Sequence, residues 1–267
     1  MGILNVNNDS FYPASRASGV DAAAARARDM ARCGADVIDI GAESTRPGST
    51  GLDEGAELAA LIPVVRAVRE SLPGVPISVD TRKAAVASES IRAGADIIND
   101  VSGLDLPEEA SAMTRLVAGS GAAYVLMHTK GRPETMQVSP GYDEFLPELL
   151  SFLDERIERL ASAGVARDRI IIDPGVGFGK RFGDNLDILA NLGMMRRFGL
   201  PILVGASRKG FIGRALGLPD PADRLEGTLA ISALCADRGV EVIRVHDVLE
   251  NRRVVDMIDA VRRRANE

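Results

Sequence analysis

The chain has 267 residues, of which 46% are hydrophobic, 26% charged and 4% aromatic, and its net charge is −6. This composition is that of a soluble globular protein large enough to bury a sizeable core. The acidic balance and the lack of Trp argue against a nucleic-acid partner, which would need a basic surface and, for single strands, aromatic stacking.

Short hydrophobic runs alternate along the chain with longer stretches of helical character. The runs predict strands at 1–6, 37–41, 77–80, 96–100, 124–128, 170–173, 202–207 and 242–246. The longer stretches predict helices at about 21–32, 53–71, 83–93, 108–119, 143–163, 185–198 and 223–238, and a last helix closes the chain. Asp21 is a typical N-cap and Gly34 a typical terminator for the first helix.

Eight strands that alternate with eight helices predict parallel β–α–β units of the α/β class. The three consecutive isoleucines of 170–172 are hydrophobic on both faces of their strand, as in a parallel sheet. Eight units in about 250 residues favour a (β/α)8 TIM barrel over an open doubly wound sheet. The nucleotide-binding Gly-x-Gly-x-x-Gly of open sheets is absent after the first strand. With no internal linker, residues 1–267 are expected to form a single domain.

Location follows from two further observations. No hydrophobic run approaches the roughly 20 residues that a membrane span requires, so we expect no membrane partner. We also expect no signal peptide ahead of the first strand, and a cytoplasmic protein. Cys33 and Cys235 lie far apart in the sequence and are expected to be reduced core residues.

In a TIM barrel the active site lies at the carboxyl ends of the strands. Every predicted strand carries polar groups there: Asn5, Asp39, Asp80, Asn99, His128, Asp173, Ser207 with Lys209, and Arg244 with His246. Any one of them could cap a helix or solvate a loop, but capping alone does not account for all eight.

The types of these residues indicate a ligand. A carboxylate at the floor of a hydrophobic mouth is costly to desolvate unless a matched donor pairs with it. Asp80, Asn99 and Asp173 therefore suit a flat heterocycle with two adjacent N–H donors. Cationic groups suited to phosphate oxygens follow other strands: Arg46, Arg208, Lys209, Arg244 and His246. Asn5 offers a hard oxygen ligand for Mg²⁺, which water and a diphosphate would complete.

Several kinds of catalytic site are not indicated. The histidines and aspartates lack the ligand spacing of a zinc site, and the sequence has no nucleophile elbow. The glycines of 175–180 have the wrong spacing for a Walker motif, and Arg181 stands where Ser or Thr is required. The pattern favours binding of a planar ring and a diphosphate over covalent catalysis.

Eight groups of motifs, in order and in register with the eight strands, resemble those of the dihydropteroate synthases, which belong to the pterin-binding enzymes. They are 2–6 with 9–11, 38–48, 78–81 with Lys83, 98–103, 126–128, 173–180, 207–209 and 244–248. The resemblance extends from Gly2 to about Val248.

The resemblance implies a transferase of folate synthesis and a sulfonamide target. Such an enzyme joins 6-hydroxymethyl-7,8-dihydropterin diphosphate to 4-aminobenzoate and releases pyrophosphate. By similarity the pterin would be bound by Asp80, Asn99, Asp173 and Lys209, of which Asp80, Asp173 and Lys209 would also be catalytic. The diphosphate would be bound by Asn5, Arg244 and His246, and Asn5 would also bind Mg²⁺. The 4-aminobenzoate site would be formed by Phe11, Thr45, Arg46, Pro47 and Ser207.

The implied reaction needs no protein nucleophile. The C–O bond to the diphosphate breaks first, Asp80 offsets the charge of the pterin carbocation, and the aniline nitrogen then attacks. The family is usually dimeric, so the resemblance also implies a homodimer.

The first loop departs from the family pattern, because Asn7-Asn8 stands where the family usually has Thr-Pro. This departure bears on the 4-aminobenzoate site and on sulfonamide response, not on the pterin site. Two alternatives remain: a non-catalytic pterin-binding paralogue, and a methyltetrahydrofolate:corrinoid methyltransferase. The methyltransferase has no use for a diphosphate site, and the motifs 207–209 and 43–48 argue against it.

Overall fold

The computed structural model describes residues 1–267 apart from 7–15, 44–50, 106, 132–139 and 266–267, and for 16–18 and 107–108 it describes the backbone alone. Within these residues the strands are β1 (Gly2–Asn5), β2 (Ile38–Gly41), β3 (Ile77–Asp80), β4 (Ile97–Asp100), β5 (Ala123–Met127), β6 (Ile170–Asp173), β7 (Leu203–Val204) and β8 (Val242–Ile243). The α-helices are α1 (Arg16–Arg32), α2 (Glu54–Ser71), α3 (Ala84–Ala93), α4 (Pro107–Ser120), α5 (Phe145–Ser162), α6 (Phe182–Ala190), α7 (Gly210–Leu216), α8 (Leu225–Asp237) and α9 (Val248–Ala265). Short 3-10 helices are η2 (Arg167–Arg169), η3 (Leu192–Phe198) and η4 (Pro221–Asp223).

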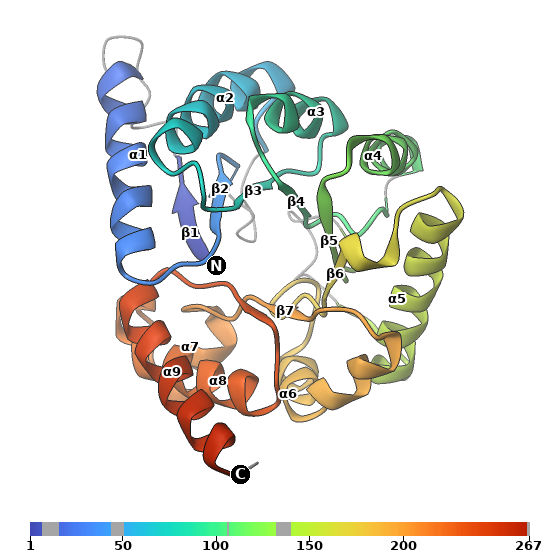
Figure 1. The fold of residues 1–267 in the computed structure, drawn as a ribbon. Helices are drawn as coiled ribbons and strands as arrows, with labels where there is room; N and C mark the ends of the chain where they lie inside the picture. Colours follow the sequence, from blue (N-terminus) through green and yellow to red (C-terminus); the bar gives the residue numbers. More distant parts are fainter. Residues whose placement is uncertain (7–15, 44–50, 106, 132–139, 266–267) are drawn as a thin grey trace.

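The strands form a closed parallel ring with the helices around it (Figure 1). Strands β1 to β6 pair in chain order, and β7 pairs with β8. Parallel bridges from Ile172 to Ile202 and from Gly2 to Val245 join the two sheets. At the second junction the amide of Ile3 donates to the carbonyl of Val245 at 2.9 Å. The predicted (β/α)8 TIM barrel is therefore confirmed.

The elements differ from the predicted ones mainly in the last third of the chain. Helix α1 also begins at Arg16 rather than at about 21, so Asp21 lies inside the helix and is not its N-cap. Strands β7 and β8 are shorter than the predicted 202–207 and 242–246, although single bridges and hydrogen bonds at Ile202, Arg244 and Val245 continue the pairing beyond them. The predicted helix 185–198 divides at Asn191 into α6 and the 3-10 helix η3. The loop after β7 also contains α7, which the sequence analysis missed and which ends at Gly217 with a φ of 70°.

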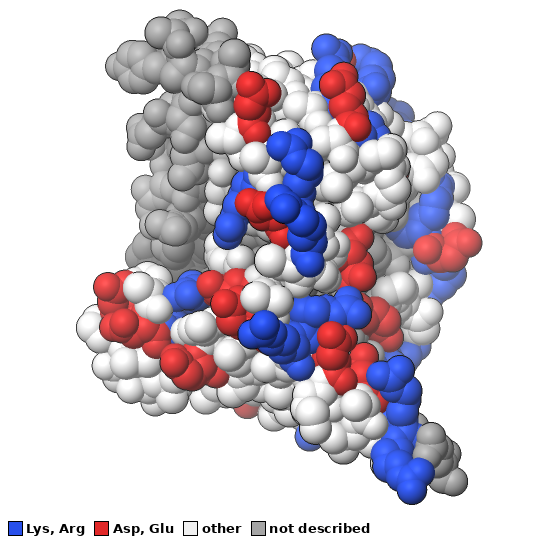
Figure 2. All heavy atoms as spheres, turned by 60° about the vertical axis from the view of Figure 1, so that its left-hand side comes forward, with Lys and Arg blue, Asp and Glu red and all other residues white. Residues whose placement is uncertain are grey.

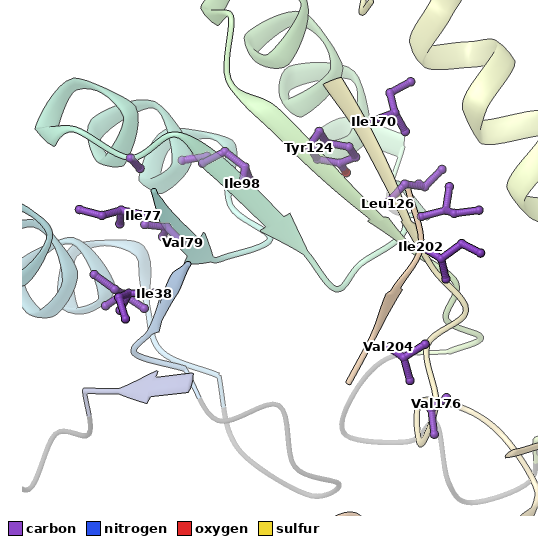
Figure 3. Close-up of a cluster of buried hydrophobic side chains, with 14 of the residues drawn as sticks. Ile38, Ile77, Val79, Ile98, Tyr124, Leu126, Ile170, Val176, Ile202 and Val204 are labelled. Carbon is purple, nitrogen blue, oxygen red and sulfur yellow. The ribbon is translucent and has the colours of Figure 1, made fainter. Parts of the chain in front are cut away.

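Successive side chains along each strand point alternately to the outside and the inside of the barrel, so the protein has two hydrophobic cores. Ile38, Ile77, Ile98 and Tyr124 pack with helix residues in the large core outside the ring, and Figure 3 shows them with their neighbours from β6 and β7. The residues of opposite parity point into the barrel. At the lower end they form a small hydrophobic cluster of Ile97, Val125 and Leu203, with partly buried Met1, Val37, Ala123, Ile171 and Val242 packed against it.

The side chains that point into the barrel are polar near the carboxyl ends of the strands. Asp80 pairs in register with Asn99, and Gly41 separates Asp80 from Asn5 in the same row. A Cβ at Gly41 would lie 3.2 Å from the Cβ of Asp80, so glycine leaves room for that side chain. The alternation thus places the polar strand-end residues above the small hydrophobic cluster of Ile97, Val125 and Leu203, which we call the hydrophobic plug.

The outer surface carries mixed charge. On the face shown in Figure 2, basic and acidic side chains lie interspersed. Exposed ion pairs include Arg32 with Asp29 on α1 and Arg252 with Asp36 and Asp256. Among the helices in the described ranges, none has both the length and the hydrophobicity needed to cross a membrane.

Candidate active site

Arg244, which follows β8, joins two buried carboxylates at the barrel mouth. Its Nε donates to Oδ2 of Asp39 at 2.6 Å, and its Nη2 donates to Oδ2 of Asp80 at 2.9 Å. Asp39 also accepts from Oγ of Ser78 at 2.5 Å and from Nδ2 of Asn99 at 3.4 Å. We call these five residues the Arg244 cluster. Its members come from β2, β3, β4 and the end of β8.

Burial dominates the electrostatics of this cluster. It raises the pKa of Asp80 to about 7, because the Arg244 charge only partly offsets the desolvation and the nearby Asp39 charge adds to it. Burial alone would lower the pKa of Arg244, but Asp39 and Asp80 outweigh it and raise that pKa. The guanidinium therefore stays charged, while Asp80 can gain or lose a proton near neutral pH.

Asp173 lies at the end of β6 and opens the glycine-rich loop 174–180. Its Oδ1 accepts from the amide of Gly175 at 2.7 Å. Burial raises the pKa of Asp173, opposed chiefly by the charge of Lys209. The Nζ of Lys209 donates to the carbonyl of Val176 and lies 4.4 Å from the ring centroid of Phe178. Burial lowers the pKa of Lys209 to about 8, and the Asp173 charge opposes that shift.

Lys180, a buried lysine, holds this loop. The Nζ of Lys180 lies 2.9 Å from Nδ1 of His128 and donates to the carbonyls of His128 at 3.1 Å and Phe178 at 2.9 Å. Burial lowers the pKa values of Lys180 and His128 well below their usual ranges. We call Asp173, Lys209, Lys180 and His128, with the loop 174–180, the Asp173 cluster.

The glycines of the loop permit its close approach to the end of β5. Gly175 has a φ of 68°, and a Cβ there would lie 1.9 Å from the carbonyl oxygen of His128. A Cβ at Gly179 would lie 2.3 Å from the carbonyl oxygen of Lys130. Only glycine fits these positions, since side chains rarely adopt positive φ and none has room here.

Ser207 and His246 meet between the ends of β7 and β8. Oγ of Ser207 lies 2.9 Å from Nδ1 of His246 and accepts from the His246 amide at 3.2 Å. Arg208 has a φ of 56°, and its guanidinium donates to both carboxylate oxygens of Asp247 at 2.7 and 2.9 Å.

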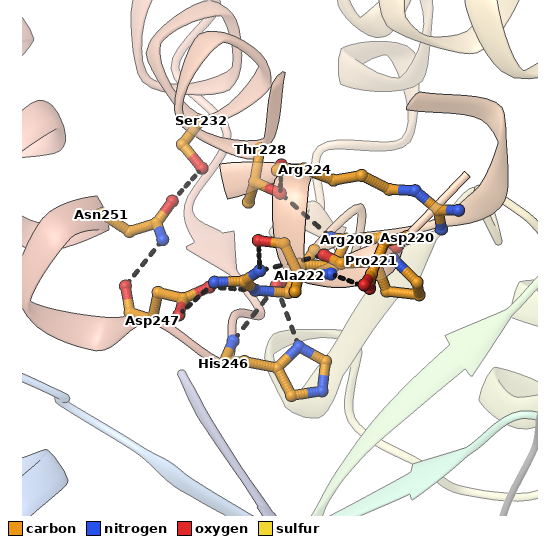
Figure 4. A network of polar contacts seen from close by, with 11 residues as sticks. Arg208, Asp220, Pro221, Ala222, Arg224, Thr228, Ser232, His246, Asp247 and Asn251 are labelled. Carbon is orange, nitrogen blue, oxygen red and sulfur yellow. Dashed lines mark hydrogen bonds and ion pairs between the residues drawn. The ribbon is translucent and has the colours of Figure 1, made fainter. Parts of the chain in front are cut away.

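Figure 4 shows how Arg208 is tied into the network behind the site. Its amide donates to Oγ1 of Thr228 at 3.0 Å, and its Nη1 donates to the carbonyls of Pro221 and Ala222. Arg208, which the sequence groups with phosphate-binding cations, therefore contacts Asp247 and helix η4.

The other predicted site residues are Asn5, which the structure describes, and four residues of the 4-aminobenzoate site, which it does not describe. Asn5 ends β1 with an exposed side chain. The described residues contain no group of three or more His, Cys, Asp or Glu that could bind a metal unaided. Asn5 thus fits a Mg²⁺ ion only if substrate and water supply most of its ligands. Four residues predicted to bind 4-aminobenzoate lie outside the described residues: Phe11, Thr45, Arg46 and Pro47. Asn7 and Asn8 lie outside them as well.

Several residues of the two clusters, Asp39 and Lys180 among them, had no predicted role. Asp39 was recognised only as a strand end, although its inward parity could have placed it below Asp80. Lys180 was recognised only as the end of a motif. No pattern in the sequence signals that its ammonium group turns back to His128.

Comparisons with known proteins agree with this geometry. A family model described as pterin binding enzyme matches residues 1–246. The chain is 43% identical over 261 residues to the dihydropteroate synthase of Bacillus subtilis, covering 98% of this chain and 87% of that protein. It is 42% identical over 260 residues to the Escherichia coli dihydropteroate synthase, covering 97% and 90%.

Solved structures give the same result. A Yersinia pestis dihydropteroate synthase with a sulfonamide drug complex has a TM-score of 0.90 and 42% identity, covering 98% of this chain and 93% of that one. A Thermus thermophilus dihydropteroate synthase in complex with 4-aminobenzoate has a TM-score of 0.85 and 40% identity, covering 97% and 93%.

Proposed function

The chain belongs to the pterin binding enzyme family and is a transferase of the dihydropteroate synthase type. From this premise we propose that it joins 6-hydroxymethyl-7,8-dihydropterin diphosphate to 4-aminobenzoate, giving 7,8-dihydropteroate and pyrophosphate. The observation that carries the proposal is the polar layer of Asp80, Asn99 and Asp173 above the hydrophobic plug. It brings hydrogen-bond acceptors from β3, β4 and β6 to one mouth, where they suit the N–H donors of a pterin ring.

The Asp173 cluster suits the pterin ring. The carboxylate of Asp173 faces the two-donor edge of the ring, and Asn99 supplies an amide that can both donate and accept. Lys209 donates to ring acceptors and balances the charge of Asp173. Because Lys180 and the backbone of the loop are already paired with each other, they hold the floor of this pocket in place.

The diphosphate belongs near Asn5, Arg244 and His246. Arg244 presents terminal nitrogens at the mouth, and His246 lies within reach of Ser207 at its rim. Asn5 would be the protein ligand of a Mg²⁺ ion, and the bound ion would supply positive charge against the leaving diphosphate. Arg244 and His246 add to that charge as the C–O bond breaks.

Asp80 then offsets the cation that is left on the pterin. Its carboxylate is ionised above pH about 7, and it accepts from Arg244 before the substrate binds. The aniline nitrogen of 4-aminobenzoate attacks this cation, so no side chain has to become a nucleophile. Phe11, Thr45, Arg46, Pro47 and Ser207 would form the 4-aminobenzoate site, where the sulfonamides bound by the Yersinia pestis relative would compete. We also propose a cytoplasmic homodimer, as in the family generally.

Incubation of the purified protein with pterin diphosphate, 4-aminobenzoate and Mg²⁺ tests the proposal. We expect pyrophosphate and dihydropteroate in equal amounts. Asp80→Asn should reduce kcat/KM about 10²- to 10³-fold, the loss typical of removing one group that stabilises transition-state charge. Pyrophosphate release no faster than the background would refute catalysis and favour the non-catalytic paralogue.

A further inference from the structure

Asp39 is a buried carboxylate to which the proposed reaction assigns no role. It lies on β2 with its side chain directed into the barrel and is 0% exposed. In register it pairs with Ser78, whereas Asp80 pairs with Gly41 one inward-facing row higher. Asp39 therefore lies in the row directly beneath the residues that would contact the pterin.

The partners of Asp39 set it apart from an ordinary structural carboxylate. Asp100, equally buried on β4 of the same sheet, faces the helices and pairs with the hydroxyl of Tyr124 at 2.6 Å and the amide of Ser102 at 2.7 Å. Asp39 instead accepts from Arg244 and Asn99. A buried carboxylate without hydrogen-bond donors strongly destabilises the fold. The fold therefore favours conformations in which Arg244 and Asn99 keep their bonds to Asp39, and this restricts the positions of both side chains.

Two nitrogens of the Arg244 guanidinium bond to different carboxylates. Nε, on the side nearer the chain, is bound by Asp39 in the lower row, whereas Nη2 reaches up to Asp80. The bond to Asp39 can persist while Nη2 changes partner, because the two bonds use different N–H groups of the guanidinium.

We propose that Asp39 is a positioning residue that holds Arg244 by Nε and Asn99 by its amide. The terminal nitrogens of Arg244 can then pass from Asp80 to an anionic group of the substrate. This inference rests on the proposed function for the placement of the diphosphate. It adds the support that orients the anion-binding guanidinium.

Charge makes Asp39 suited to this role. With two carboxylates on one guanidinium, Arg244 keeps a counter-charge when Nη2 leaves Asp80, and Asp80 becomes free to accept from the pterin. With Asn in place of Asp39, Asp80 would be the remaining carboxylate bonded to Arg244 among the described residues. Arg244 is then held more tightly to Asp80 and less available to phosphate.

The variant Asp39→Asn tests this role because it keeps the shape and removes the charge. We expect the affinity for inorganic pyrophosphate with Mg²⁺, measured by calorimetry, to fall about tenfold, within the range of couplings between contacting residues. In turnover, kcat should fall while KM for 4-aminobenzoate changes less than about twofold. The double variant Asp39→Asn with Arg244→Gln should bind pyrophosphate no more weakly than Arg244→Gln alone.

The matched control is Asp100→Asn, which removes an equally buried carboxylate from β4 of the same sheet. It should lower the unfolding midpoint and leave the pyrophosphate affinity of the folded protein within about twofold. An equal loss of affinity in Asp100→Asn, or additive losses in the double variant, would overturn the proposal.

A measurement on the unsubstituted protein guards against a variant that does not fold. The Nε–H NMR signal of Arg244, assigned by its disappearance in Arg244→Lys, should exchange slowly with water. It should stay protected when pyrophosphate is added. Exchange as fast as that of exposed arginines would refute the bond to Asp39. None of these binding measurements needs turnover, so failure of the pyrophosphate-release assay would be recognised separately as failure of the proposed function.

Discussion

The Arg244 cluster and the Asp173 cluster occupy the same barrel mouth but stabilise buried charge in opposite ways. In the Arg244 cluster two carboxylates share one guanidinium, and every hydrogen bond joins side chains at strand positions or immediately after β8. In the Asp173 cluster one carboxylate faces two lysines, whose ammonium groups donate largely to backbone carbonyls.

The difference lies in which groups can lose their charge. A guanidinium stays protonated in proteins, so the Arg244 cluster always keeps a cation, while its carboxylates outnumber that cation. Lysines give up a proton when buried, and the pKa values of Lys180 and Lys209 are both lowered. The first cluster is thus suited to charge that changes during a reaction, and the second to a neutral ring that must be recognised.

The largest effect should come from removing the one carboxylate of the Asp173 cluster. Asp173→Asn should weaken pterin binding by about 2–4 kcal/mol, because a buried donor edge loses its charged acceptor. Calorimetry with a pterin ligand measures the change, and Asp187→Asn on the exposed face of α6 is the control. A loss under about 0.5 kcal/mol would mean that Asp173 only caps the loop through Gly175.

The two lysines of the Asp173 cluster should separate stability from binding. Lys180→Met leaves the carbonyls of His128 and Phe178 without their donor, so the free energy of unfolding should fall by about 1–3 kcal/mol. Lys209→Met should weaken pterin binding and cost less stability, since Lys209 is only partly buried. Denaturant titration and calorimetry on both variants test the contrast. Equal stability losses would show that both lysines serve only the fold.

The sequence was sufficient for the barrel and for one layer of the site. Asp80, Asn99, Asp173 and Arg244 were predicted at the mouth because each lies at or next to the carboxyl end of a predicted strand, whatever its partners are.

The partners of the site residues could not be predicted. Arg208 follows Ser207 directly, yet its positive φ turns it to Asp247, and no sequence pattern specifies that bond. The ammonium of Lys180 turns back 52 residues along the chain to His128. Helix α7 was missed because it is a short insertion between β7 and α8, with few turns over which a period can be recognised.

The smallest effect, on pH dependence, assigns one titration to each cluster. Burial raises the pKa of Asp80 to about 7 and lowers that of Lys209 to about 8. Asp80 must be ionised to offset the pterin cation, and Lys209 must be protonated to donate. The kcat/KM for the pterin diphosphate should therefore rise with pH through about 7 and fall through about 8.

Asp39→Asn removes a negative neighbour of Asp80, so it should move the acid limb to lower pH by less than about one unit and leave the alkaline limb in place. Lys209→Arg should instead abolish the alkaline limb, because arginine keeps its proton. Rates measured below KM from about pH 6 to 9 test both shifts, and a limb that moves in neither variant belongs to the substrate.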